Sequence, residues 1–202
     1  MHIHSDSFRN GDPIPAGHAL GVPDGFGDNR NPHLAWDGAP EGTRSFALLC
    51  IDTDAPTDAS LAGKAGTTIP ADMPRTGFVH WAMVDIPSDV RGIAEGSCSD
   101  GFDKGGKTAP RGPRGARQGR NDYTGWFAGD ADLAGTYLGY DGPYPPPNDL
   151  RTHRYFFRVF ALDVDRLPVA DGFTAADVLR AMQGHVLAEA AIHGTYSLHA
   201  GA

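Results

Sequence analysis

The chain has 202 residues, a formal net charge of -8 at neutral pH and 40% hydrophobic residues. A chain of this length can bury about 70% of its unfolded surface without disulfides or metals, so we expect one domain over residues 1–202. The negative charge disfavours nucleic acid and anionic membrane surfaces as partners, because both would repel the molecule. No apolar run approaches the roughly 18 residues of a membrane helix, and the first residues lack a basic stretch followed by an apolar core. We therefore predict a cytoplasmic protein without an integral membrane segment.

Turn-forming residues dominate the composition. There are 27 glycines and 16 prolines, and 22 aspartates stand against 3 glutamates. These residues favour turns and loops over helices, so we expect a mainly β protein. The two cysteines are Cys50 and Cys98, and Cys50 lies inside an apolar run, which favours a buried free thiol over a disulfide.

The first third of the chain predicts short strands joined by long loops. Residues 1–31 suggest an opening strand in which His2 and His4 share one face, but a chain terminus is a poor metal site and we predict no bound metal. A short strand is expected around Leu34–Trp36. A central strand is expected over Ser45–Ile51, because both of its faces are apolar.

Two carboxylates follow the central strand directly. Asp52 and Asp54 stand two positions apart in Asp52-Thr53-Asp54-Ala55-Pro56, so they would project to the same side, and Pro56 would end the strand. The alternative role is turn formation, since aspartate before proline commonly caps a bend. The loop over residues 57–77 is long and glycine-rich, as loops at binding sites or interfaces often are.

A second strand begins with a histidine. The sequence predicts a strand over His80–Pro87, with His80, Ala82, Val84 and Ile86 on one face.

Residues 101–108 fit the phosphate-loop pattern, but the segment before them is polar and Ala109-Pro110 after them cannot start an ordinary helix. We therefore predict no nucleotide site there. A run of six basic residues without an acid begins in the same segment: Lys104, Lys107, Arg111, Arg114, Arg117 and Arg120. Such a run is usually a solvated loop, and its alternative is a position beside an anion site.

The stretch 139–163 joins a rigid turn to a buried strand. Gly142-Pro143 and three further prolines predict a stiff, extended loop. In the strand over 153–162, His153 and Tyr155 point to the same side, which would place a polar site on a rigid element. The alternative is an ordinary structural pair.

One helix and a last strand are expected near the end of the chain. Thr174 is the predicted N-cap of the helix, with Asp177 three residues on and apolar positions at Val178, Leu179, Met182, Val186 and Leu187. A final strand is predicted over Gly194–Leu198.

Taken together, these motifs resemble the phosphatidylethanolamine-binding protein family, in its bacterial Raf-kinase-inhibitor-like branch. The family reads Asp-Pro-Asp-x-Pro followed by His-Trp or His-His, and later Gly-Pro, prolines and His-Arg-Tyr; here Thr53 stands where the family has proline. The resemblance covers most of the chain and implies two packed antiparallel β-sheets, peripheral helices including one at the C-terminal end, and a small anion pocket. The residues that match the family's pocket are Asp52, Asp54, His80, His153 and Tyr155, with Gly142 and Pro143 at its rim.

We predict a binding protein for a small anionic ligand, such as a phosphate ester or a phospholipid head group, with no cofactor and no catalytic residue. The histidines, the tyrosine hydroxyl and backbone amides near Gly142 can donate to phosphate oxygens. Carboxylates would repel a phosphate, so our hypothesis is that Asp52 and Asp54 accept hydrogen bonds from the histidines and favour their protonated form.

Two alternatives stay open. One is a hydrolase in which an aspartate and a histidine act as an acid-base pair on a small ester, although no nucleophile and no Gly-x-Ser-x-Gly pattern accompanies them. The other is a regulator of another protein, similar to a kinase or protease inhibitor. The natural ligand, a protein target and a homodimer also stay open.

Overall fold

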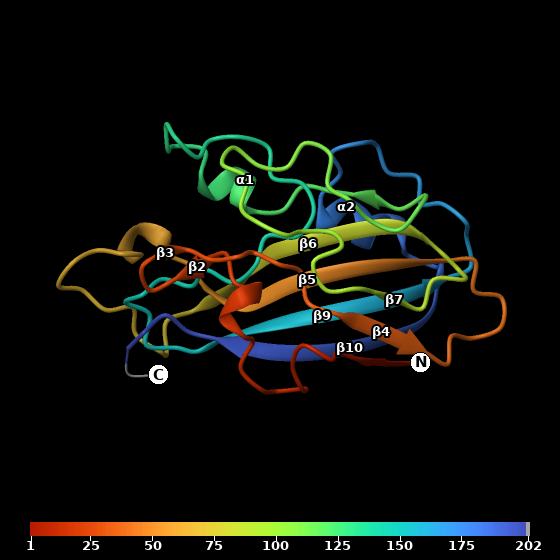
Figure 1. Ribbon diagram of the computed structural model, residues 1–202, viewed down its shortest axis with the longest axis horizontal. Coiled ribbons are helices and arrows are strands. Elements are labelled where there is room, and N and C mark those ends of the chain that lie inside the picture. The colour runs from red at the N-terminus through yellow and green to blue at the C-terminus, as the bar shows by residue number, and fades with distance from the viewer. Residues whose placement is uncertain (201–202) are drawn as a thin grey trace.

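The computed structural model describes residues 1–200, which are built mainly from β-strands (Figure 1). The largest sheet is antiparallel, and its five strands lie in the order β10 (Val186–Tyr196), β9 (His153–Leu162), β5 (Ser45–Pro56), β6 (Arg75–Pro87) and β8 (Arg117–Gln118). A three-stranded antiparallel sheet contains β1 (His2–His4), β4 (Leu34–Asp37) and β7 (Gly92–Ile93). A small hairpin pairs β2 (Gly21–Val22) with β3 (Gly25–Phe26).

The helices are short. They are α1 (Tyr123–Trp126) and α2 (Ala175–Ala181), with single 3-10 turns at Ala16–His18 and Ala59–Leu61. In Figure 1 the segment that carries α1 lies along the upper edge of the view, next to β6. No helix within residues 1–200 is long and apolar enough to cross a membrane.

The central strand β5 has an apolar core on each of its faces, as its sequence predicts. Phe46 and Leu48 belong to the core that also contains Leu34 of β4, so this core joins the two larger sheets. Ala47 and Leu49 pack into a second core with residues of α2. All of these side chains are buried, and each large one contributes roughly 1.5–3 kcal/mol of burial energy.

The C-terminal helix begins as predicted and ends earlier. The Thr174 side chain caps the backbone N–H of Asp177, and the Asp177 carboxylate caps the N–H of Thr174 in return. The helix stops at Ala181, and Gly184, with φ of +82°, then reverses the chain. The prediction that Val186 and Leu187 lie on the helix is therefore wrong, because both belong to β10.

Two bulges interrupt the alternation of β6. Its pairing with β5 jumps from Phe46–Ile86 to Leu48–Met83, so three steps of β6 face two of β5. Asp85 lies in this bulge with φ of +59°. Consequently Ile86 packs in the core between the sheets and not, as the alternation predicts, with Ala82 and Val84. The second jump, from Cys50–Trp81 to Ile51–Val79, leaves His80 as the extra residue.

Candidate ligand-binding site

A small cavity opens at one end of the five-stranded sheet. Its polar residues are Asp52 of β5, His80 of β6, and His153 and Tyr155 of β9. Aromatic and proline side chains form much of the remaining wall: Phe78, Tyr123, Trp126, Tyr144, Pro145 and Pro146. The cavity has a volume of about 40 Å³. Such a cavity holds about three water-sized groups, which is the size of a small polar head group.

The bulge in β6 turns His80 toward the cavity. A bulge re-aims the side chain of its extra residue, and here that residue would otherwise point to the face opposite Tyr155. The helix α1 is held against the same strand, because the Asp122 carboxylate accepts the N–H of Val79 at 2.7 Å and the N–H of Asp122 donates to the Val79 carbonyl at 2.9 Å. Tyr123 thereby packs edge-on against the His80 ring.

The Nδ1 atom of His80 is hydrogen-bonded to the backbone. It lies 2.8 Å from the carbonyl oxygen of Asp141 and 3.1 Å from that of Gly142. Carbonyl oxygens only accept, so Nδ1 carries the proton and donates it. Burial lowers the pKa of His80 and outweighs the opposing effect of the Asp52 carboxylate. The lowered pKa favours the neutral imidazole, in which Nε2 is the remaining polar atom.

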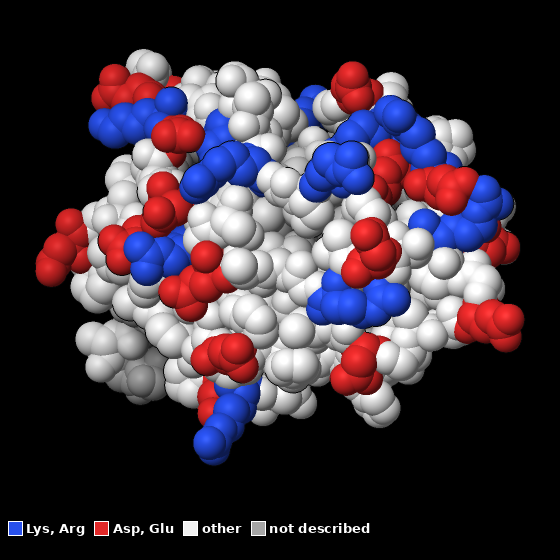
Figure 2. Space-filling model, turned by 45° about the vertical axis from the view of Figure 1, so that its right-hand side comes forward, with Lys and Arg blue, Asp and Glu red and all other residues white. Residues whose placement is uncertain are grey.

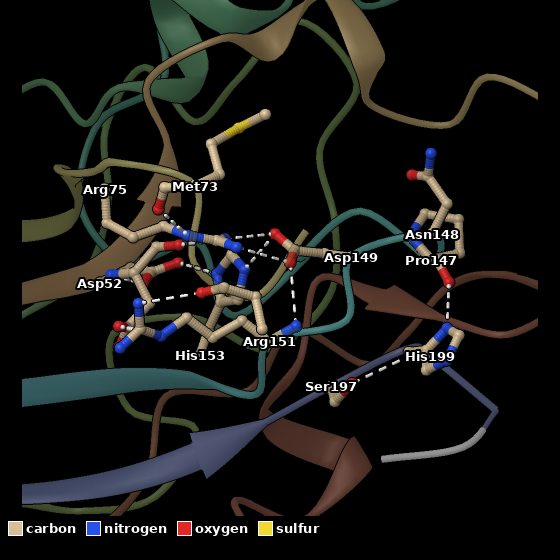
Figure 3. Close-up of polar contacts among 12 residues, drawn as sticks. Asp52, Met73, Arg75, Pro147, Asn148, Asp149, Arg151, His153, Ser197 and His199 are labelled. Atoms are coloured by element: carbon tan, nitrogen blue, oxygen red, sulfur yellow. Dashed lines mark hydrogen bonds and ion pairs between the residues drawn. The ribbon is translucent and has the colours of Figure 1, made fainter. Parts of the chain in front are cut away.

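His153 lies between two carboxylates (Figure 3). Its Nδ1 is 2.7 Å from Asp52 Oδ2 and its Nε2 is 3.0 Å from Asp149 Oδ2. Asp149 is itself paired with Arg75, at 2.6 Å and 3.0 Å. Burial lowers the pKa of His153, but the hydrogen bonds with Asp52 and Asp149 outweigh it and raise the pKa above its usual value. The protonated ring thus donates both N–H groups within the protein.

Asp54 serves a different partner from Asp52 and does not line the cavity. Its buried carboxylate accepts hydrogen bonds from Arg154 at 2.8 Å and 2.9 Å and forms an ion pair with Arg151 at 3.0 Å. Burial raises the pKa of Asp54, but the Arg154 hydrogen bonds outweigh it and lower the pKa. The predicted common orientation of the two aspartates is lost because β5 bulges between Asp52 and Ala55.

Gly142 and Pro143 lie behind the cavity wall and support it. The Gly142 carbonyl accepts hydrogen bonds from His80 and from the Tyr123 hydroxyl, the latter at 2.8 Å. A Cβ atom on Gly142 would lie 2.0 Å from the carbonyl oxygen of His18, so no larger residue fits there. The Pro143 carbonyl accepts the N–H of Gly21 at 2.9 Å.

Tyr155 has a buried hydroxyl in the cavity wall. The residue has 0% of its surface exposed, and within residues 1–200 its oxygen makes no well-oriented hydrogen bond, although the Asp52 carboxylate lies close to it. Burial raises the pKa of Tyr155 well above its usual value, and the nearby Asp52 carboxylate adds to the effect. The phenol is therefore neutral, and its proton can point toward the Asp52 carboxylate or into the cavity.

Several cavity residues do not belong to any motif from which the sequence could have identified them. Tyr123 and Trp126 come from a segment that the sequence linked to an anion site only through the neighbouring basic run. Asp149 lies four residues before His153, in the loop that follows the prolines. This short distance in the sequence was the signal that could have identified Asp149 as a partner of His153.

The basic run does not reach the cavity. Lys107 binds Asp141 at 2.5 Å and Arg117 binds Asp85 at 2.6 Å, and none of the six basic residues is part of the cavity wall. Residues 101–108 form turns, with neither a strand directly before them nor a helix directly after them. The segment therefore lacks the strand and helix on which a phosphate loop depends.

This arrangement of antiparallel sheets and motif residues is that of the phosphatidylethanolamine-binding proteins, and the chain belongs to this family. The model of the family, described as phosphatidylethanolamine-binding protein, matches residues 4–197.

Among individual proteins, the chain is similar to UPF0098 protein YbhB of Escherichia coli K12, with 35% identity over 98% of this chain and 100% of YbhB. It is also 35% identical to a UPF0098 protein of Aquifex aeolicus, over 97% of this chain and 88% of that protein. The crystal structure of E. coli YbcL, described as a new member of the mammalian family, superimposes with a TM-score of 0.72 at 29% identity over 97% of each chain. A homologue from Chlamydia trachomatis gives a TM-score of 0.65 at 28% identity over 97% of this chain and 96% of its own.

Proposed function

We propose that this protein binds a small anionic head group, such as that of a phosphate ester, in the cavity between Asp52, His80, His153 and Tyr155. The observation that carries the proposal is the buried Tyr155 hydroxyl, which lines the cavity beside the Asp52 carboxylate and makes no well-oriented hydrogen bond within residues 1–200. Leaving such a donor unpaired costs about 1–3 kcal/mol, and an anion oxygen in the cavity would recover that energy.

Cations compensate the carboxylates around the cavity, so these carboxylates do not exclude an anion as the ligand. The ion pairs form two separate groups. With His153 protonated, Arg75 and His153 balance Asp52 and Asp149 at the cavity. Away from the cavity wall, Arg151 and Arg154 pair with Asp54 and leave one positive charge.

Calorimetric titration with phosphoethanolamine tests the proposal. Tyr155→Phe should bind about tenfold more weakly than the wild type, because it loses one hydrogen bond to a charged oxygen. Tyr140→Phe is the matched control: Tyr140 is also fully buried, but its hydroxyl donates to the His18 carbonyl at 2.7 Å and is not part of the cavity wall.

Unchanged affinity in a folded Tyr155→Phe variant would refute the assignment of the ligand to this cavity. An assay for released inorganic phosphate in the same samples addresses the hydrolase alternative. We expect the ester to be recovered intact, since His153, the histidine next to Asp52, already donates both N–H groups to carboxylates.

A further inference from the structure

A second hollow, with a volume of about 270 Å³, adjoins the cavity. Its lining is mostly aromatic and proline side chains, so we call it the aromatic groove. The residues that line both the groove and the cavity are Trp126, Tyr144, Pro145 and Pro146. The residues that line only the groove include Phe26, Phe127, Asp130 and Leu133. Changes in this second set therefore leave the cavity wall intact.

The groove contains the exposed aromatic surface of the protein. Phe26 is 40% exposed and Trp126 is 44% exposed. Every other aromatic side chain within residues 1–200 is buried or partly buried. Exposed apolar surface that gathers in a hollow marks an interaction site, because a partner that covers it removes apolar area from water.

The walls of the groove are firmly held. The Tyr144 ring meets that of Phe26 at 78°, with ring centroids 5.9 Å apart, and Phe26 stacks on Phe102 at 4.3 Å. Tyr144 packs so closely on Gly21 that a Cβ atom on that glycine would collide with the ring. Two rings at nearly a right angle form a corner that accepts a compact apolar ring such as that of proline. Prolines in the polyproline II conformation are already ordered before binding, so they lose little entropy on entering such a groove.

One unpaired carboxylate lies in the groove. Asp130 is the only charged residue that lines it within residues 1–200. Its Oδ1 accepts the backbone N–H groups of Asp132 at 2.9 Å and Leu133 at 3.1 Å, and neither aspartate forms an ion pair within the described chain. The neighbouring Lys64 lies close to the Asp58 carboxylate. A ligand with a positive charge matches this groove, and an arginine guanidinium can both stack on an aromatic ring and pair with a carboxylate.

The groove fits one of the common modes of peptide binding. An α-helix is about 10 Å wide with its side chains and requires a long apolar channel. An added β-strand requires the unpaired edge of a sheet, whereas side chains of the β2–β3 hairpin, α1 and loops line the groove. We propose that the aromatic groove binds a proline-rich segment of another protein, in the polyproline II conformation, with a basic residue that pairs with Asp130. This proposal does not depend on the ligand of the cavity.

Trp126 provides a signal for peptide binding. The chain has three tryptophans, of which Trp36 and Trp81 are 2% and 0% exposed. A change in tryptophan emission on adding a peptide therefore reports on the groove. The probe is a blocked oligoproline peptide with an arginine at each end, because polyproline II ligands can bind in either direction. It should give a saturable blue shift of the emission.

Three comparison probes test the chemistry of the proposed ligand. An oligoproline peptide with glutamate at each end tests the charge, and a Gly-Ser peptide with the same two arginines tests the conformation. Both should bind at least about tenfold more weakly than the oligoproline peptide with arginines. N-acetylarginine amide should bind more weakly still. Equal affinity of any of these three probes would overturn the proposal, as would a wild type that shows no shift at about 1 mM peptide.

Two variants test the location of the site. Phe26→Ala removes one wall of the corner, and Asp130→Asn removes the charge but keeps the Oδ1 acceptor for the loop. Each should weaken the arginine peptide about fivefold or more. The matched controls are Leu179→Ala, a side chain 41% exposed on α2, and Asp89→Asn, an exposed aspartate after the far end of β6. Both controls should bind the peptide as the wild type does.

The same variants keep the two proposals apart. Neither Phe26 nor Asp130 lines the cavity, so both variants should bind phosphoethanolamine with wild-type affinity. Wild-type affinity for the arginine peptide in both folded variants would overturn the groove as the site. Sedimentation without peptide examines a second copy of the chain as the occupant. A dimer that Phe26→Ala dissociates would assign the groove to contacts between copies and overturn the proposal.

Discussion

At the scale of single residues, the Tyr155 hydroxyl is buried without a well-oriented hydrogen bond to the rest of the fold. Tyr155→Phe removes an unsatisfied buried group, so the free energy of unfolding should stay the same or rise by about 1 kcal/mol. Tyr140→Phe removes a hydrogen bond to the His18 carbonyl and should lower it by about 1 kcal/mol. Chemical denaturation of both variants without ligand measures the difference. Equal destabilisation would mean that Tyr155 has a structural partner after all.

His153 makes the stability of the protein depend on pH. Its folded pKa is raised: burial lowers it, but the hydrogen bonds with Asp52 and Asp149 prevail. The stabilisation is therefore full below the ordinary histidine pKa of about 6.5 and is lost as the pH rises through the folded pKa. We expect the unfolding free energy to fall across this range in the wild type, and to fall less in His153→Gln, which cannot titrate. Denaturation curves between about pH 6 and about pH 9 provide the measurement, and parallel pH profiles would exclude His153 as the cause.

The sequence predicts site residues correctly where a motif lies on a regular strand. His153 and Tyr155 alternate normally on β9, and the prediction that they share a face agrees with their common position in the cavity wall. Asp54 could not be placed in this way, because a bulge breaks the alternation after Asp52. Bulges depend on the pairing of two strands, and a single sequence does not state its pairing register.

At the scale of elements, the same limit applies to β6. The strand was predicted over His80–Pro87, but β6 begins earlier, at Arg75, within the segment predicted as a loop. Ala82 and Val84 share the expected core, whereas His80, predicted on the same face, lines the cavity. The change of face at Ile86 was not predicted, because it requires Asp85 to adopt a positive φ. A bulge of this kind is stabilised by contacts from elsewhere in the chain. Here the Asp85 carboxylate accepts the N–H of Leu167 at 2.8 Å and the Nε of Arg117 at 2.6 Å.

Asp85 should therefore carry much of the stability of the bulge. Asp85→Gly keeps the positive φ but loses both hydrogen bonds, and we expect it to cost about 2–3 kcal/mol of unfolding free energy. Asp85→Ala should cost about 1 kcal/mol more, since it must also adopt the left-handed conformation. Thermal or chemical unfolding compares the two, with Asp89→Ala as the control at an exposed aspartate in the turn that follows β6. Glycine and alanine variants of equal stability would argue against backbone strain at this position.

At the scale of the whole molecule, charge is distributed and largely paired. Figure 2 shows acidic and basic side chains interspersed over one face of the protein. The basic run from Lys104 to Arg120, which looked continuous in the sequence, is divided among separate structural roles. Arg117 supports the β6 bulge, Arg120 donates to the Gly172 carbonyl at 2.8 Å, and Lys107 enters a buried cluster. A linear sequence shows the sign of such charges but not their partners.

That buried cluster connects four distant segments of the chain to the cavity. The carboxylate of Asp141, fully buried, accepts hydrogen bonds from Asn29 at 2.7 Å, Asn121 at 2.8 Å and Lys107 at 2.5 Å. The backbone carbonyl of the same residue holds Nδ1 of His80. A defect in the cluster should therefore reach both the stability of the fold and the binding of the ligand.

Lys107→Met provides the test. It leaves Asp141 buried without a counter-charge, and breaking a buried ion pair in this way costs about 3 kcal/mol or more. Burial already raises the pKa of Asp141 against the effect of Lys107, so losing the lysine raises it further. A carboxyl with a raised folded pKa destabilises the protein increasingly as the pH rises, so the loss should be smaller at about pH 5 than at about pH 8. Affinity for the phosphate ester should fall as well, because Asp141 positions His80. Lys104→Met, at an exposed lysine three residues earlier, should change neither quantity. If Lys107→Met lowers the unfolding free energy but binds the ester as the wild type does, the cluster supports the fold alone and does not position His80.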